Sequence, residues 1–184
     1  MRTFIAIDIP RSVKKKIEAN TRKARSNFPE LKWVEPHNLH ITLKFLGEVQ
    51  ERRISEIEAG LKEVASKFSP FELQIGPPDS FDAGGAVRVL WLSIEKGGDL
   101  LTELANEVEN QLARMGFPRE KRPFQAHLTI ARSRRSGPKV RFSMLNLPRE
   151  SFPPFTVREI IIYKSTLTPS GPIYEKIKVI GLRK

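Results

Sequence analysis

A short pattern, His-x-Thr-x, occurs twice in this chain and constrains its fold more than any other feature. His40-Ile-Thr-Leu43 and His127-Leu-Thr-Ile130 lie in apolar runs 87 positions apart in a chain of 184 residues. Because side chains alternate between the two faces of a β-strand, each His shares a face with its Thr. The intervening apolar residues then point toward a core. We therefore predict two strands, each presenting an imidazole and a hydroxyl on one face.

The segments before the two copies also match, since each copy follows a strand and a helix. Hydrophobic periodicity predicts strands over 4–9, 32–35, 40–46, 71–75, 87–94, 127–131, 155–167 and 174–182, and helices over 11–26, 51–68 and 99–115. A repeat of this kind indicates internal duplication. We predict an α+β fold in which two similar lobes, related by a pseudo-two-fold axis, place two antiparallel sheets on either side of a central cleft, with helices outside. We expect a single domain over 1–184, with the lobes meeting near 76–86, where Gly76-Pro77-Pro78 predicts a turn.

The composition excludes several kinds of chemistry. The chain contains no cysteine, which excludes disulfides, thiolate catalysis and cysteine-ligated zinc. His37 and His40 are three positions apart, but no acidic cluster near them completes a metal-binding set, so we expect no metal. No apolar run approaches the roughly 18 residues that suggest a membrane span. The apolar start of the chain is too short for a signal peptide, and we expect a cytoplasmic protein.

The net charge points toward an anionic partner. Lys and Arg total 32 against 21 acidic residues, a formal charge of +11. Such a balance is typical of proteins that bind polyanions such as nucleic acids. The alternative is a basic protein whose Lys and Arg side chains are simply solvated, as in proteins from hot environments.

Two imidazoles facing one cleft are suited to moving two protons across a phosphate. The ordinary pKa of histidine lies near working pH, so one ring can accept a proton from water while the other donates a proton to a leaving oxygen. Hydroxyls of Thr42 and Thr129 can stabilise the extra negative charge of the transition state. The third histidine, His37, follows Pro36 and is expected in a surface loop.

Four further residues are candidates for substrate contacts. Strand alternation places Lys44 on the face of His40, where it can touch phosphate or reach solvent at the rim of the cleft. The same alternation places Ala131 on the His127 face, whereas Arg132 begins a basic loop that can fold back onto substrate. Phe4 and Tyr163 lie near the motifs and can stack on a base or belong to the core. Alternation assigns Phe45 to the packed face.

The paired motifs resemble those of the 2H phosphoesterase superfamily. Within it, the chain looks like the RNA 2′,3′-cyclic phosphodiesterase branch, also called the 2′-5′ RNA ligase family. The segments that resemble that branch are His40-Ile-Thr-Leu-Lys-Phe-Leu-Gly47, Phe124-Gln-Ala-His-Leu-Thr-Ile-Ala-Arg132, Phe4-Ile-Ala-Ile-Asp-Ile-Pro10, Ile162-Tyr-Lys-Ser-Thr-Leu167 and Gly171-Pro-Ile-Tyr174.

The resemblance implies metal-independent hydrolysis of an RNA 2′,3′-cyclic phosphate to a 2′-phosphate, with no cofactor. It implies that His40 is the proton donor to the 3′ oxygen, that His127 is the base activating water, and that Thr42 and Thr129 hold the phosphoryl oxygens. The expected partners are RNA ends, including tRNA fragments, and a nucleotide; we expect a monomer. Two alternatives stay open: joining of tRNA halves by the reverse chemistry, and a non-catalytic RNA or nucleotide binder that uses the basic loop from Arg132 to Arg141.

Overall fold

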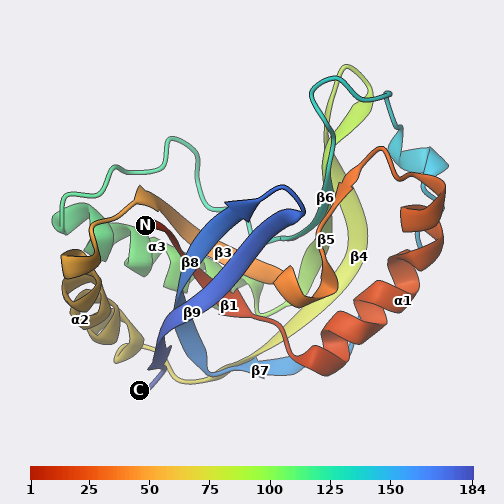
Figure 1. Ribbon diagram of the computed structural model, residues 1–184. Helices are drawn as coiled ribbons and strands as arrows, with labels where there is room; N and C mark the ends of the chain where they lie inside the picture. The colour runs from red at the N-terminus through yellow and green to blue at the C-terminus, as the bar shows by residue number, and fades with distance from the viewer.

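The computed structural model describes residues 1–184 as two curled antiparallel sheets with three α-helices (Figure 1). One sheet has the strand order β3-β1-β8-β9 and the other the order β2-β6-β5-β4-β7. The α-helices are α1 (Arg11–Asn27), α2 (Ile54–Ala65) and α3 (Gly98–Arg114). The strands are β1 (Arg2–Asp8), β2 (Lys32–Trp33), β3 (His40–Glu48), β4 (Phe71–Ala83), β5 (Ala86–Lys96), β6 (Leu128–Arg132), β7 (Phe155–Val157), β8 (Glu159–Thr168) and β9 (Gly171–Gly181).

Strand β1 lies at the centre of the four-stranded sheet and is buried on both faces. Ile5 and Ile7 point into the main hydrophobic core, which contains 39 buried residues. Phe4 and Ala6 point to the other face, where they pack with Ile161 and Tyr163 of β8 in a separate small cluster. In the β1–β3 pairing, Ala6 lies opposite Thr42 and Asp8 opposite His40. The first His-x-Thr pair therefore lies on the face of the small cluster, away from the main core.

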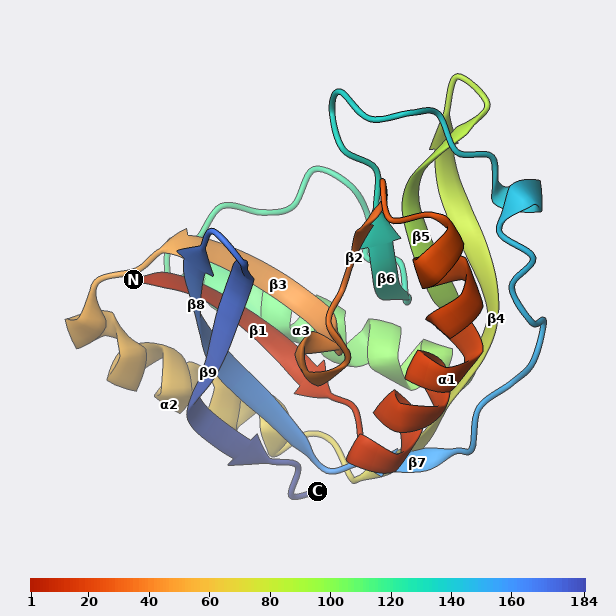
Figure 2. The same ribbon diagram turned by 45° about the vertical axis from the view of Figure 1, so that its right-hand side comes forward.

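Helices α1 and α3 lie against the sheet other than the one that contains the strand before them, whereas α2 stays with the sheet of its preceding strand β3. Helix α1 follows β1 of the four-stranded sheet but lies alongside the five-stranded sheet (Figures 1 and 2). Helix α3 follows β5 of the five-stranded sheet but contacts β3, and α2 contacts β8 and β9. Each helix presents one buried apolar face, such as Leu101, Leu104, Val108 and Leu112 in α3. None of the helices is long and apolar enough to cross a membrane.

The structure confirms the predicted α+β fold with two antiparallel sheets, and it differs from the expected elements in two places. The turn predicted at 76–78 is wrong, because β4 continues to Ala83 and accommodates Gly76 and Pro77 as a bulge opposite β5. A bulge is one of the few positions in a sheet that tolerate a proline. The run predicted as one strand over 155–167 is two strands, β7 and β8, which belong to different sheets.

Both sheets combine strands from both halves of the chain. The four-stranded sheet joins β1 and β3 to β8 and β9, and the five-stranded sheet joins β2 to β4, β5, β6 and β7. Residues 76–86, where the repeat suggested that the lobes meet, lie in the hairpin of β4 and β5, inside the five-stranded sheet. The two sheets are thus interleaved along the chain and are not separated by one cut at its middle.

Candidate active site

The two His-x-Thr motifs lie on neighbouring strands of different sheets. His40 is the first residue of β3, and His127 immediately precedes β6. Cα atoms of β3 and β6 approach within 8 Å of each other, and Figure 2 shows the starts of both strands on the same side of the molecule. The fold therefore brings together the two strands that contain or follow the motifs, although they are far apart in the chain.

His40 is held in one tautomer by the chain just before it. Its Nδ1 donates a hydrogen bond of 2.6 Å to the carbonyl oxygen of Asn38, because a carbonyl can only accept. Nε2 lies 3.0 Å from the hydroxyl of Thr42, which donates to it when the ring is neutral. Asn38 in turn donates from its side chain to the carbonyl of Pro172, which ties this segment to the β8–β9 turn. Nε2 is thus the ring nitrogen available for proton transfer.

His127 is oriented in the same way. Its Nδ1 donates a hydrogen bond of 2.6 Å to the carbonyl oxygen of Gln125, which, like Asn38, lies two residues before its histidine. No protein atom forms a hydrogen bond with Nε2 of His127. The two imidazoles therefore have matching tautomers, and they differ in that only His40 is engaged by its threonine.

Aromatic rings surround both imidazoles. The ring centroids of Phe4 and Tyr174 lie 4.8 Å and 5.1 Å from that of His40. The rings of Phe81 and Trp91 lie edge-on to His127, at 5.6 Å and 6.1 Å. These rings form apolar walls that partly bury each imidazole.

This burial changes the acid–base properties of both histidines. Desolvation lowers the pKa of His40 below its ordinary value of 6.5, opposed by the hydrogen bond to Asn38. Desolvation also lowers the pKa of His127, with a contribution in the same direction from the positive charge of Arg132. The neutral form is therefore favoured for both rings, as a proton acceptor requires.

An ion-pair cluster lies beside His40. The carboxylate of Asp8 forms ion pairs with the ammonium groups of Lys14 in α1, at 2.7 Å, and Lys176 in β9, at 2.6 Å. Burial acts to raise the pKa of Asp8, but the hydrogen bonds from the two lysines outweigh it and hold the pKa below its ordinary value. The cluster joins three separate elements at the end of β1 where His40 pairs.

A β-bulge in each His-x-Thr strand changes which residues share the face of the histidines. In β3, Ile5 pairs with Lys44 and Ala6 with Thr42, so that Leu43 is an extra residue. In β6, Leu90 pairs with Ala131 and Trp91 with Thr129, so that Ile130 is extra. Alternation is interrupted at the equivalent position of both motifs, because a bulge places two consecutive side chains on one side.

The bulges overturn three of the expected placements. Lys44 does not share the face of His40; it is 3% exposed and donates hydrogen bonds of 2.6 Å to Glu109 of α3 and 2.8 Å to the Pro118 carbonyl. Phe45 is not packed in the core but 56% exposed on the histidine face, with its ring 5.8 Å from that of Phe4. Ala131 is fully buried.

Arg132, in contrast, follows the bulge of β6 and is exposed. Alternation restarts after the bulge, so Arg132 lies on the face of Thr129, as Phe45 lies on the face of Thr42. The basic loop that follows is fastened elsewhere, because Arg134 donates to the carbonyl of Glu30.

The structure places the remaining candidates around His40. Phe4 is 2% exposed and stacks on Tyr163, with centroids 5.1 Å apart, so both rings support the imidazole from behind and leave no face open to a base. His37 is exposed in a single 3₁₀ turn, Pro36–Asn38, as expected. No group of three or more His, Cys, Asp or Glu side chains gathers as a metal site.

Sequence reasoning did not identify Tyr174, Phe81 or Trp91 as neighbours of the histidines. All three lie on strands, but which strands pair with β3 and β6 is a long-range property. Trp91 faces Thr129 directly across the β5–β6 pair, and its indole N–H is buried without a hydrogen-bond partner. Its position between the apolar residues Leu90 and Leu92, which are buried, is the one sequence signal that Trp91 points away from the core.

Comparison with known proteins gives consistent matches along nearly the whole chain. A sequence model of the 2′-5′ RNA ligase superfamily matches residues 10–168. The RNA 2′,3′-cyclic phosphodiesterase of Archaeoglobus fulgidus is 41% identical over 97% of this chain and 99% of its own length. The protein of the same name from Thermotoga maritima is 38% identical over 95% of this chain and 92% of its own length.

Solved structures agree with these sequence matches. The protein TT0787 of Thermus thermophilus superposes with a TM-score of 0.81 at 27% identity, over 100% of this chain and 98% of that one. The Escherichia coli LigT structure with 3′-AMP has a TM-score of 0.74 at 27% identity, with the same coverage. The family match, the identities and the shared fold together show that this chain belongs to the 2′-5′ RNA ligase superfamily.

Proposed function

We propose that this protein hydrolyses the 2′,3′-cyclic phosphate at an RNA 3′ end to a 2′-phosphate, using His40 as acid and His127 as base. Relatives at 31–41% identity named RNA 2′,3′-cyclic phosphodiesterase support the reaction. The observation that most supports the mechanism is the matched orientation of the two imidazoles. Each Nδ1 is bound to a backbone carbonyl two residues upstream, which leaves each Nε2 for the substrate.

In the proposed reaction, water attacks phosphorus and the bond between phosphorus and the 3′ oxygen breaks. The proton of the attacking water passes to Nε2 of His127, and a proton from Nε2 of His40 passes to the departing 3′ oxygen. We assign the base to His127 because no protein group occupies its Nε2, whereas Nε2 of His40 contacts Thr42. Two positioned proton transfers of this type each contribute about 10²–10⁴ in rate.

Protonation of His40 also prepares Thr42 for its proposed role. With a neutral ring, the Thr42 hydroxyl hydrogen is used in the bond to Nε2. Once Nε2 carries a proton, that nitrogen can no longer accept, and the hydroxyl hydrogen is released to a phosphoryl oxygen. Thr129 provides the equivalent donor on the other strand, and exposed Arg132 adds a positive charge on its face. These donors meet the negative charge that develops in the transition state.

The proposal predicts that His40→Ala and His127→Ala each reduce kcat by at least about a hundredfold, since each removes one proton-transfer group. His37→Ala is the matched control, because it removes the only other histidine, from an exposed turn. Hydrolysis of a 2′,3′-cyclic phosphate oligoribonucleotide is measured with and without EDTA, and circular dichroism checks the fold.

Near-normal activity in either active-site variant, or a loss of activity with EDTA, contradicts the proposed mechanism. We propose no metal because the donors described above supply both proton transfers and charge stabilisation. A loss of kcat in His37→Ala as large as that in the active-site variants would indicate that removing any histidine impairs the protein.

Joining of RNA ends is the same chemistry with an RNA 5′-hydroxyl in place of water. The same Nε2 atoms serve both directions, so incubation with paired tRNA fragments distinguishes joining from hydrolysis by the product formed.

Escherichia coli LigT has been solved with ATP and with NADP⁺, and we extend the proposal to nucleotide binding at this site. We also propose that the enzyme is a monomer. A non-catalytic binder leaves the matched histidine tautomers without a role.

A further inference from the structure

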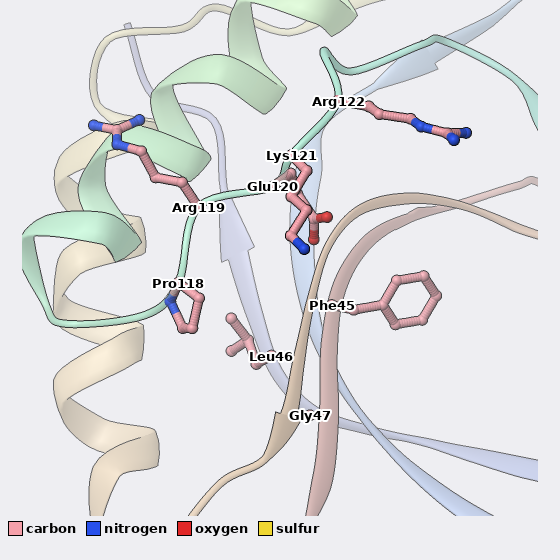
Figure 3. A pocket seen from close by; sticks show the side chains of 8 residues that line it. All are labelled: Phe45, Leu46, Gly47, Pro118, Arg119, Glu120, Lys121 and Arg122. Carbon is pink, nitrogen blue, oxygen red and sulfur yellow. The ribbon is translucent and has the colours of Figure 1, made fainter.

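A groove lies beside the proposed site, between the end of β3 and the loop that follows α3. It encloses about 500 Å³ and is lined by Phe45, Leu46, Gly47, Pro118, Arg119, Glu120, Lys121 and Arg122 (Figure 3). Phe45 and Arg122 extend to the same side in Figure 3, whereas Arg119 points away over α3. Arg119 is bound to Asn110, while Lys121 and Arg122 are exposed and form no ion pair.

Phe45 connects the groove to the face of β3 on which His40 and Thr42 lie. The ring centroid of Phe4 lies 4.8 Å from that of His40 and 5.8 Å from that of Phe45. Phe45 lies three residues past Thr42 on the same strand, roughly 10 Å along it at the usual rise per residue. A ligand chain held at Thr42 and extending along β3 therefore reaches Phe45.

The groove wall is held in place by hydrogen bonds centred on the buried side chain of Lys44. Lys44 donates to Glu109 and to the Pro118 carbonyl, and Glu109 accepts a further hydrogen bond of 2.9 Å from the backbone N–H of Glu120. These contacts fasten the loop of Lys121 and Arg122 to the strand that contains Phe45. Glu120 is the one acidic residue that lines the groove, and its negative charge opposes the binding of an anion.

We propose that this groove binds the nucleotide on the 5′ side of the reacting ribose in single-stranded RNA. Phe45 stacks on its base, and Lys121 and Arg122 contact the phosphates that flank it. An exposed aromatic ring beside unpaired basic residues is the combination that single-stranded nucleic acid requires. The inference rests on the proposed function and adds a preference for RNA chains over cyclic mononucleotides.

The test compares two substrates, adenosine 2′,3′-cyclic phosphate and a short oligoribonucleotide that ends in the same cyclic nucleotide. We expect wild-type kcat/KM to be higher for the oligonucleotide. In Lys121→Gln/Arg122→Gln, the ratio of kcat/KM for the oligonucleotide to that for the mononucleotide falls roughly tenfold, mainly through KM, and the salt dependence of KM weakens. Phe45→Leu lowers the same ratio by at least about fivefold, the loss of one stacked base.

The matched control is Lys15→Gln/Lys16→Gln, which removes the same charge from exposed positions on α1 and leaves the ratio unchanged. If the wild type hydrolyses neither substrate, the proposed function fails. If it hydrolyses both, and the groove variants keep the wild-type ratio or match the α1 control, the groove is not an RNA site. Thermal unfolding shows whether each variant is folded.

Discussion

At the scale of single residues, the proposed activity rests on two imidazoles in largely apolar surroundings. Desolvation lowers the pKa of both, so that neither is strongly protonated at neutral pH. The proposed mechanism needs one ring charged and the other neutral, and the two titrations belong to the pair as a whole. The activity is therefore expected to be highest at the pH where the form with one charged and one neutral imidazole is most abundant.

We predict a bell-shaped dependence of kcat/KM on pH with its maximum below 6.5. The maximum lies midway between the two apparent pKa values of the free enzyme, and both values are below the ordinary 6.5. Measurement of kcat/KM across the range with a cyclic mononucleotide checks this. A maximum above 6.5 would show that burial does not control these rings.

At the scale of secondary-structure elements, local pattern predicted most helices and strands but failed at the bulges. In the second motif, consecutive apolar residues Ile130-Ala131 before Arg132 are a signal that alternation is interrupted. In the first motif, the polarity of Leu43-Lys44-Phe45 predicts an exposed lysine and a buried phenylalanine. The structure shows the reverse, with Lys44 buried and Phe45 exposed. The partner that makes burial of Lys44 acceptable, Glu109, is 65 positions away, so no local rule reveals it.

The buried pair predicts the stability of the link between β3 and α3. We expect Lys44→Met to cost about 3 kcal/mol of unfolding free energy, because it leaves Glu109 without its cation in a largely buried position. Lys44→Met/Glu109→Leu removes both charges and regains part of that loss. Urea unfolding of the wild type, both single variants and the double variant gives the coupling energy. An additive double variant would mean that the two side chains do not interact.

At the scale of the whole molecule, the α+β architecture with two antiparallel sheets followed from the repeat, but strand partners did not. The repeat predicted two sheets meeting at a cleft, and the position of each His at the start of a strand. It did not indicate that β8 and β9 complete the sheet of β1, or that α1 lies on the other sheet. Those pairings depend on burial of Ile5, Ile7, Ile160 and Ile162 in one core, a long-range requirement.

Stability of the whole fold is predicted to decrease on mild acidification. Each histidine has a lower pKa when folded than its ordinary 6.5, so the unfolded chain binds more protons as pH falls below 6.5. The stability gained from keeping both rings neutral is complete above pH 6.5. It is lost as the pH falls toward the pKa values of the two histidines in the folded protein. Asp8 acts in a separate window, below its ordinary 3.8.

Unfolding free energy measured as a function of pH checks this prediction. His40→Gln/His127→Gln removes both titrating rings, and its stability should vary less than that of the wild type just below the ordinary histidine pKa of 6.5. Equal slopes for the two proteins would assign the decrease to other groups.

The interleaving of the sheets has a consequence for how the protein is made. Strand β1 is synthesised before the other strands of this fold, but one of its two neighbours, β8, begins only at Glu159. Until then one edge of a strand that is apolar on both faces stays unpaired, and such edges associate with other chains. Strands β8 and β9, the last of the fold to be synthesised, thus close the edge opened by β1, so the face of the four-stranded sheet that contains His40 is completed only after Glu159 has been made.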